Sequence, residues 1–169
     1  PQIAVLLPCY NEELTIASVV RAFQHALPES TVYVYDNAST DQTAARAREA
    51  GASVAFEARR GKGEVVKRMF ADIEADIYVM ADGDGTYDAP SAPRLIERLI
   101  TDNLDMVVGS RDESQEIRDD KVYRRGHRLG NRLFNWFVSL LFTNQFSDIF
   151  SGYRVFSRRF VKSYPAIAK

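Results

Sequence analysis

The sequence predicts an α/β fold in which a mostly parallel sheet is flanked by helices. Through residues 1–110, short β-rich runs alternate with stretches whose apolar residues recur at helical spacing. Polar motifs follow the ends of the predicted strands, which is where open α/β sheets bind their ligands. With 169 residues, 46% of them hydrophobic and 27% charged, the chain suits one soluble domain with a substantial core.

Strands and helices are expected to alternate along the first two-thirds of the chain. The strands are predicted at residues 3–7, 31–36, 53–57, 77–81 and 105–110. Asn11 is expected to cap the first helix, with two glutamates in the first turn. The later helices are predicted over 39–51, 63–75 and around 95–100. Such alternation favours parallel strands joined by helical crossovers.

The pattern changes after Ser110. Residues 111–128 are almost wholly polar, 129–142 carry a broad apolar face, and 147–160 contain a short strand and the start of a helix. Residues 1–110 hold 10 Lys and Arg against 17 Asp and Glu, whereas 111–169 hold 12 against 6. We expect one domain, 1–169, whose two parts face different ligands or different ends of one ligand. We also expect the chain to be a piece of a longer protein, because no closing element is evident after residue 160.

Several classes of protein are disfavoured by what the chain contains. Its single cysteine, Cys9, excludes an internal disulfide framework and is expected to be a small core residue. Neither His25 nor His127 has a partner that suggests a zinc site. No Gly-x-Ser-x-Gly motif of a serine hydrolase is present, and no apolar run approaches the ~20 residues that span a bilayer.

The acidic turn after the fourth strand is the clearest candidate for chemistry. Asp82 and Asp84, separated by Gly83, directly follow the apolar run of 77–81. Two hard oxygen ligands so close together suit Mg²⁺ or Mn²⁺, which also accept substrate phosphates. The alternative is a solvated acidic turn, but the position at the end of a buried strand favours the metal. Asp88 is expected to cap the following helix instead.

Two further motifs indicate a nucleotide. Asp36 ends the second strand, where an acidic residue in a nucleotide fold commonly bonds a ribose or base. The run 59–63, Arg-Arg-Gly-Lys-Gly, places cations and flexible backbone at a helix start and could contact a phosphate. It lacks the spacing of a P-loop, and taken by itself it could be a simple turn.

A cationic run lies in the last third of the chain. Between residues 121 and 132 there are five Lys and Arg and no acid, and Arg111 and Arg154 flank this run. No nucleic-acid-binding motif accompanies it. Beside the apolar helix 129–142, a lipid with a phosphate head at a membrane surface is the better match. The alternative that 129–142 is an ordinary core helix stays open.

Together the motifs resemble those of a known family. LLPCYNEE, VYDNASTDQT, RRGKGEVVKRMF, ADGDGTYDAP, VVGSRD and FSGYRVFSR occur in the order typical of family 2 glycosyltransferases with the Rossmann-like GT-A fold. The most similar group is the dolichol-phosphate mannose synthase-like and polyprenyl-phosphate glycosyltransferases. Thr86 stands where many of these synthases have Gln, and the Gln-x-x-Arg-Trp motif of processive polysaccharide synthases is absent.

The resemblance implies roles for particular residues. It implies a donor site for a nucleotide-diphosphate sugar, UDP- or GDP-linked, formed by Pro8, Tyr10, Asn11, Glu12, Asp36, Asn37, Ser39, Lys62, Asp82 and Gly83. Asp84, with Asp82, would hold the metal on the diphosphate. Arg111, Arg125 and Arg154 are the candidates for the acceptor phosphate or the donor diphosphate.

The acceptor is expected to be a polyprenyl phosphate, at the cytoplasmic face of the membrane. A phosphate is already anionic at neutral pH and needs positioning cations, whereas a hydroxyl needs a general base. After Asp120 the chain has one carboxylate, Asp148, and many arginines. The alternatives are transfer to a hydroxyl of a glycan or lipid, and a non-catalytic module that binds nucleotide sugars.

Overall fold

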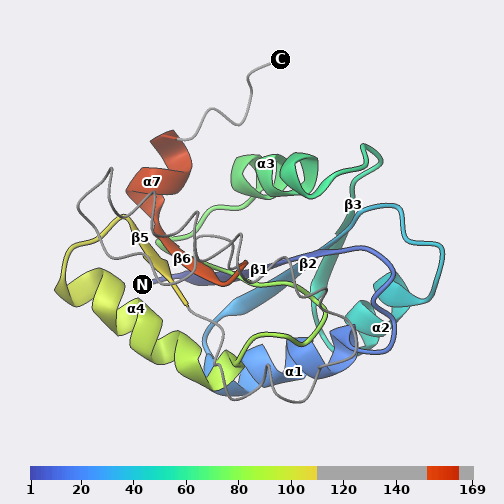
Figure 1. Ribbon diagram of the computed structural model, residues 1–169, viewed down its shortest axis with the longest axis horizontal. Helices are drawn as coiled ribbons and strands as arrows, with labels where there is room; N and C mark the ends of the chain where they lie inside the picture. Colours follow the sequence, from blue (N-terminus) through green and yellow to red (C-terminus); the bar gives the residue numbers. More distant parts are fainter. Residues whose placement is uncertain (110–151, 164–169) are drawn as a thin grey trace, which may run out of the picture. The chain divides into compact units, whose positions relative to one another are not determined.

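The structure is a computed structural model that describes residues 1–109 and 152–163. The elements of the described residues are β1 (Ile3–Cys9), α1 (Ile16–Ala26), β2 (Thr31–Asp36), α2 (Thr43–Glu49), β3 (Ser53–Phe56), α3 (Lys62–Asp72), β4 (Ile77–Met80), a 3₁₀ turn η1 (Ala89–Ser91), α4 (Ala92–Thr101), β5 (Met106–Val108), β6 (Arg154–Ser157) and α7 (Arg158–Ser163) (Figure 1). The predicted fold class is confirmed.

The strands form one six-stranded sheet in the order β3-β2-β1-β4-β6-β5. The pairs β1–β2, β1–β4 and β2–β3 are parallel, and β6 runs antiparallel to β4. The short strand expected within 147–160 is β6, and the helix start expected there is α7. The sheet is therefore mostly parallel, with β6 added beside its centre by a segment distant in sequence.

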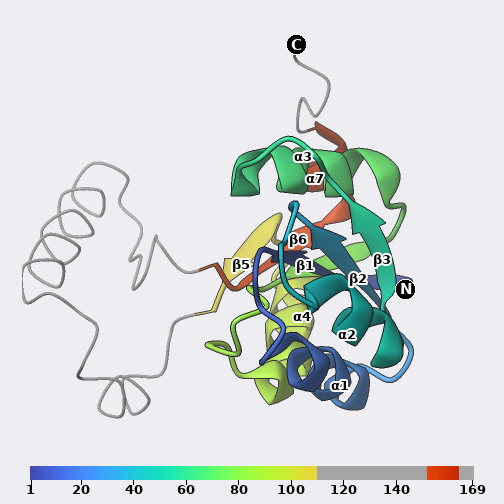
Figure 2. The same cartoon turned by 90° about the vertical axis from the view of Figure 1, so that its right-hand side faces the viewer.

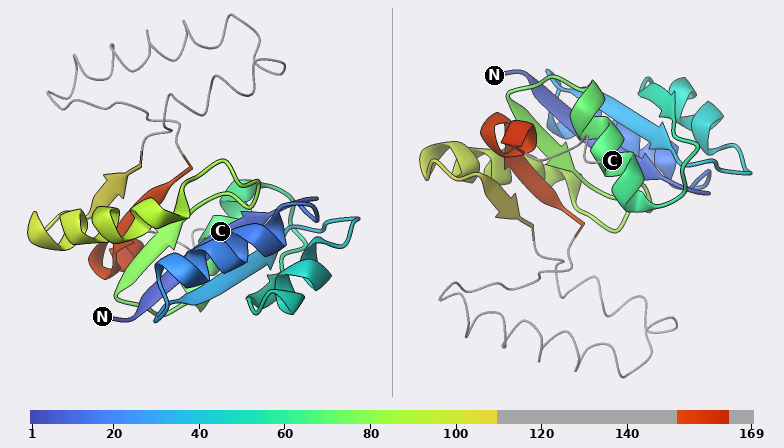
Figure 3. Two further views of the ribbon diagram at one scale, coloured as in Figure 1. Left: turned by 90° about the horizontal axis from the view of Figure 1, so that it is seen from below. Right: turned by 90° about the horizontal axis from the view of Figure 1, so that it is seen from above.

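Helices cover both faces of the sheet. On one face lie α1, α2 and α4, and on the other lie α3 and α7 (Figures 2 and 3). Strand β1 alternates accordingly: Val5 and Leu7 pack with the first group, whereas Ala4 and Leu6 pack with the second. Because β1 is buried on both faces, its sequence is a continuous apolar run.

The first helix begins later than the sequence suggests. It starts at Ile16, with Thr15 at the N-cap position, so the prediction that Asn11 caps it was wrong. Asn11 has φ 54°, and its side chain accepts a hydrogen bond from the backbone N–H of Thr40 (2.8 Å). An asparagine tolerates this left-handed conformation, and here it serves a loop rather than a helix.

The chain divides into two compact units. One consists of residues 1–107 and 152–169, and the other of residues 108–151. The site described below belongs to the first unit. Within the described residues, none of the helices has both the length and the apolar character needed to span a membrane.

Candidate functional site

The carboxyl ends of β1, β2 and β4 meet at one edge of the sheet and enclose a pocket of about 270 Å³. It is lined by Pro8, Cys9, Tyr10, Glu12, Asn37, Lys62, Val65, Asp82 and Asp84. Most of these residues are among those predicted to bind the donor or its metal. The remaining donor-site predictions, Asn11, Asp36, Ser39 and Gly83, lie beside the pocket rather than on its lining.

The acidic turn faces the first residue of α3. Lys62 Nζ forms an ion pair with Asp82 Oδ1, and Asp84 Oδ1 accepts a hydrogen bond from the backbone N–H of Thr86 (2.9 Å). Asp84 is exposed, whereas Asp82 is half-buried. One carboxylate is thus already neutralised by a lysine, and the other is open to a cation or ligand.

The conformation of the turn depends on close contacts with Gly83. Its carbonyl oxygen accepts a hydrogen bond from Thr15 Oγ1 (2.8 Å). A Cβ at Gly83 would overlap Glu12 Oε2 and lie 2.6 Å from Cys9 Sγ. A side chain at position 83 would force the Glu12 carboxylate and the Cys9 thiol to shift, so the glycine follows from the packing of the turn against β1 and the loop after it.

Glu12 is the most perturbed acid of the pocket. Burial is the main reason that its pKa is raised to about 7; the charges of Asp84 and Asp82 act in the same direction, and the Cys9 thiol and Lys62 oppose them. Its Oε2 is buried and has no hydrogen-bond partner among the described residues. The Cys9 thiol also donates to the carbonyl oxygen of Leu7 (3.4 Å). Cys9 is itself buried with a pKa well above its ordinary value, which confirms a packing role.

The carboxylate oxygens of Asp82, Asp84 and Glu12 fit a hard divalent cation that takes its remaining ligands from a bound substrate and from water. Among residues 1–109 and 152–163 there is no cluster of three or more His, Cys, Asp or Glu side chains that could hold a metal. Two neighbouring carboxylates and an unsatisfied carboxylate oxygen instead suit Mg²⁺ or Mn²⁺ that takes its other ligands from water and phosphate oxygens.

Hydrogen bonds join the loop after β1 to the loop after β2 and to the start of α2. The backbone N–H of Asn11 donates to Ser39 Oγ (2.9 Å), and that of Glu12 donates to Thr43 Oγ1 (2.7 Å). Asp36 is 6% exposed, and its Oδ1 accepts from the N–H of Ser39 (3.3 Å). Asn11 and Ser39 thereby brace the pocket wall.

Asn37 ties the end of β2 to the loop before α3. Its Nδ2 donates to the carbonyl oxygens of Glu57 (3.0 Å) and Arg59 (2.8 Å), and its Oδ1 accepts from the N–H of Gly61 (2.8 Å). On the same loop, Arg60 donates to Tyr10 Oη (3.1 Å), and its guanidinium lies over the Tyr10 ring, 5.1 Å from the ring centre.

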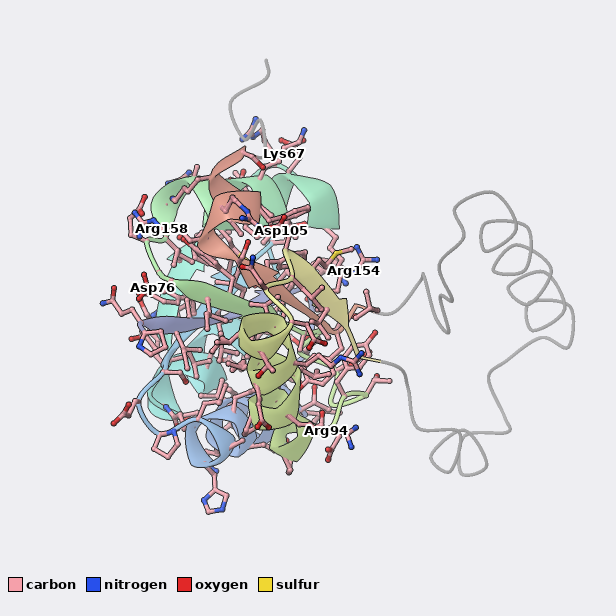
Figure 4. The ribbon with its side chains drawn as sticks, turned by 90° about the vertical axis from the view of Figure 1, so that its left-hand side faces the viewer. Lys67, Asp76, Arg94, Asp105, Arg154 and Arg158 are labelled. Atoms are coloured by element: carbon pink, nitrogen blue, oxygen red, sulfur yellow. The ribbon has the colours of Figure 1, made fainter. Side chains whose placement is uncertain are left out.

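Strand β6 brings a second segment to the acidic turn. The N–H of Gly152 donates to Tyr87 Oη (2.6 Å), and a Cβ at Gly152 would lie 2.6 Å from Asp82 Oδ2. Arg154 pairs with Met80 in the sheet, near the carboxyl end of β4. Figure 4 shows Arg154 at the end of the sheet opposite Asp76 and Arg158.

Two predicted site residues, Arg111 and Arg125, lie outside the described residues, as do the cationic run and the helix predicted over 129–142. Asp88 stands at the N-cap position of η1 without a side-chain capping bond. Sequence reasoning missed Thr15, Tyr87 and Gly152. Their roles depend on contacts across 65 or more residues of chain, for which local patterns carry no signal.

Comparison with known proteins defines the class. The model of the family described as Glycosyl transferase family 2 matches residues 4–164, so the chain belongs to this family.

Three relatives and one solved structure are informative. Protein RfbJ of Shigella flexneri is 55% identical over 75% of this chain and 95% of its own length. Glycosyltransferase AglJ of Haloferax volcanii is 38% identical over 92% of this chain, and the match spans 50% of the length of AglJ. A dolichyl-phosphate hexose transferase of the same organism is 29% identical over 92% of this chain and 66% of its own length.

Among solved structures, glucosyl-3-phosphoglycerate synthase from Mycobacterium tuberculosis, in complex with Mn²⁺, UDP-glucose and phosphoglyceric acid, superposes with a TM-score of 0.73 at 27% identity. The match covers 94% of this chain and 57% of that one. This neighbour has the GT-A fold, in agreement with the mixed sheet and flanking helices described above.

Proposed function

We propose that this chain carries the donor site of an inverting, metal-dependent glycosyltransferase that moves a sugar from a nucleotide diphosphate to a polyprenyl phosphate. The observation that carries the donor half is the pocket at the carboxyl edge, where Asp82, Asp84 and Lys62 converge in a family 2 chain. The solved neighbour that holds Mn²⁺ and UDP-glucose supports the same assignment.

In this proposal Asp84, with Asp82, holds the divalent ion. When bound, the ion supplies positive charge to the departing nucleoside diphosphate. Lys62 releases Asp82 and contacts a phosphate oxygen, and Glu12 and Tyr10 border the nucleoside. The acceptor oxygen forms a bond to the anomeric carbon while the bond from that carbon to the diphosphate breaks on the opposite face, which inverts the configuration.

The acceptor half rests on charge. The cations of 111–169 outnumber its acids two to one, and the dolichyl-phosphate hexose transferase is similar over most of this chain. A lipid phosphate would place the enzyme at the cytoplasmic face of a membrane. A second candidate is transfer to a hydroxyl, because the solved neighbour binds phosphoglyceric acid and, in a related complex, its glucosylated product.

The test is transfer by purified protein with UDP-glucose or GDP-mannose and Mn²⁺. Polyprenyl phosphate and the matched polyprenol separate a phosphate acceptor from a hydroxyl acceptor, since they share the lipid. We expect product with the phosphate only. Product with polyprenol or phosphoglyceric acid, and none with the phosphate, would favour the second candidate.

Asp84→Ala should lower turnover at least 100-fold and abolish its dependence on Mn²⁺. Asp88→Ala is the matched control, because it removes an exposed acid of the same loop that does not line the pocket. Full activity of Asp84→Ala would contradict the metal role.

A further inference from the structure

The bonding of Asn37 suggests a role other than contact with a ligand. Its side chain borders the pocket, but both Nδ2 hydrogens are used by carbonyl oxygens of Glu57 and Arg59. Its Oδ1 accepts the N–H of Gly61, and its backbone N–H donates to the carbonyl oxygen of Cys9 (2.8 Å). The residue is 7% exposed, so its donors are already satisfied inside the protein.

These bonds hold the loop 57–61 in one conformation although residues 58–61 are exposed and pack little against the core. Gly61 has φ 126°, a backbone conformation that side-chain-bearing residues rarely adopt. Arg59 and Arg60 are exposed and contribute no core packing. A second anchor within the loop is Glu57, 4% exposed, whose Oε1 accepts from the N–H of Arg59 (2.8 Å).

The loop sets the position of two cations, Lys62, which lines the pocket, and Arg60, which lies beside the pocket residue Tyr10. Lys62, the first residue of α3, follows Gly61 directly and pairs with Asp82. Arg60 lies over the ring of Tyr10. A change at Asn37 would therefore reach both cations through the backbone of the loop, to which the Asn37 side chain is bonded.

We propose that Asn37 is a positioning residue, which orders the loop 57–61 so that Lys62 faces the pocket and Arg60 lies over the ring of Tyr10. The proposal rests on the donor site described above for its functional consequence. It assigns the importance of Asn37 to loop order, and it predicts that the residue acts through Lys62.

Asn37→Asp isolates this role. The variant keeps the size of the side chain but replaces both N–H donors by an oxygen that faces two carbonyl oxygens at about 3 Å. Asn37→Ala is a second variant that removes the bonds without adding charge. Asn103→Asp is the control, since Asn103 is exposed and follows α4, away from the pocket lining.

Limited trypsin digestion of the full chain measures how well ordered the loop 57–61 is, and it needs no ligand. We expect cleavage after Arg59, Arg60 or Lys62 to be at least five times faster in Asn37→Asp and Asn37→Ala than in the wild type or Asn103→Asp. Cleavage after Arg46 and Arg48 on α2 should stay unchanged, because that helix is not anchored by Asn37. Unchanged loop cleavage, or equal acceleration at α2, would overturn the proposal.

A double-mutant cycle then tests the connection to Lys62. By calorimetry with UDP-glucose and Mn²⁺, or with GDP-mannose, Asn37→Ala, which adds no charge to the pocket, should raise the Kd about tenfold in the wild-type background, as for the loss of one charge contact. In a Lys62→Met background it should raise the Kd less than threefold. Equal effects in both backgrounds would mean that Asn37 contacts the donor directly. If the wild type bound no nucleotide sugar, the donor site would be refuted, while the digestion would still decide the role in the loop.

Discussion

Thr15 holds the acidic turn through a hydrogen bond from its hydroxyl to the carbonyl oxygen of Gly83, 68 residues further along the chain (2.8 Å). The same hydroxyl lies 3.3 Å from the carbonyl oxygen of Glu12. Thr15 also occupies the N-cap position of α1 without a side-chain capping bond. Its hydroxyl is thus used to fasten the candidate metal-binding turn to the start of a helix.

Replacing Thr15 by Val should loosen the turn at nearly constant volume. A neutral hydrogen bond is worth about 1 kcal/mol, which corresponds to about a fivefold weaker affinity if it is expressed in metal binding. We expect the Kd for Mn²⁺, measured by electron paramagnetic resonance in the presence of UDP, to rise by that factor. Thr15→Ser keeps the hydroxyl and should bind like the wild type. A loss of affinity in Thr15→Ser with none in Thr15→Val would instead assign the effect to the methyl group and contradict the role of the hydrogen bond.

Gly83→Ala should be strongly destabilising, because the new Cβ would overlap the Glu12 carboxylate and lie 2.6 Å from Cys9 Sγ. Overpacking of this kind typically costs about 1–3 kcal/mol. Gly63→Ala is the matched control: nothing lies within 4 Å of a Cβ there, and the position is inside α3, where alanine is favoured over glycine. Urea unfolding should place the two variants on opposite sides of the wild type. A Gly83→Ala protein as stable as the wild type would contradict the close approach.

Glu12 predicts a pH dependence of stability with a definite sign. An acid whose pKa rises from 4.5 to about 7 on folding holds its proton more tightly in the folded state. At low pH, where Glu12 is protonated, this tighter proton binding stabilises the folded state relative to the unfolded state. The stabilisation is lost as the pH rises from about 4.5 through 7. Glu12→Gln should have a higher melting temperature than the wild type at pH 8, by a few degrees, and no advantage at pH 4. A difference in melting temperature between the two proteins that stays constant from pH 4 to pH 8 would refute the raised pKa.

Much of the fold could be predicted because its signals are local. The runs at β1, β2 and β4 are apolar enough to be identified singly, and parallel pairing brings their polar ends, including Glu12, Asn37 and Asp82, to one edge. The cap assigned to Asn11 failed for a physical reason: its side chain finds a partner in Thr40, on a loop that only the fold brings near. The contacts Thr15–Gly83 and Tyr87–Gly152 are single hydrogen bonds between distant segments, and no periodic pattern in the sequence predicts them.

Lys62 should have opposite effects on metal and donor. In the free protein it neutralises Asp82, one of the candidate ligands, and so competes with a cation for that carboxylate. Lys62→Met should therefore bind Mn²⁺ by itself more tightly, by about two- to fivefold, as expected for an exposed ion pair worth up to about 1 kcal/mol. Because the same lysine is proposed to contact the diphosphate, the affinity of the Lys62→Met protein for UDP-glucose should fall. Titrations with the metal and with the nucleotide sugar measure the two effects separately. Loss of both affinities would mean that Lys62 supports the site as a whole and does not compete.

Gly152, which precedes β6, connects this segment to the acidic turn. Its backbone N–H donates to Tyr87 Oη, and an added Cβ would lie 2.6 Å from Asp82 Oδ2 and 2.9 Å from Tyr87 Oη. Gly152→Ala should push Asp82 from its position and weaken Mn²⁺ binding, whereas Tyr87→Phe should remove one hydrogen bond, at about 1 kcal/mol, and leave the carboxylate in place. In the double variant, the missing Tyr87 hydroxyl relieves one of the two close contacts but not the contact with Asp82. We therefore expect metal affinity to stay low in the double variant, measured by titration with Mn²⁺. Full recovery would show that the tyrosine, and not the carboxylate, limits what this position accepts.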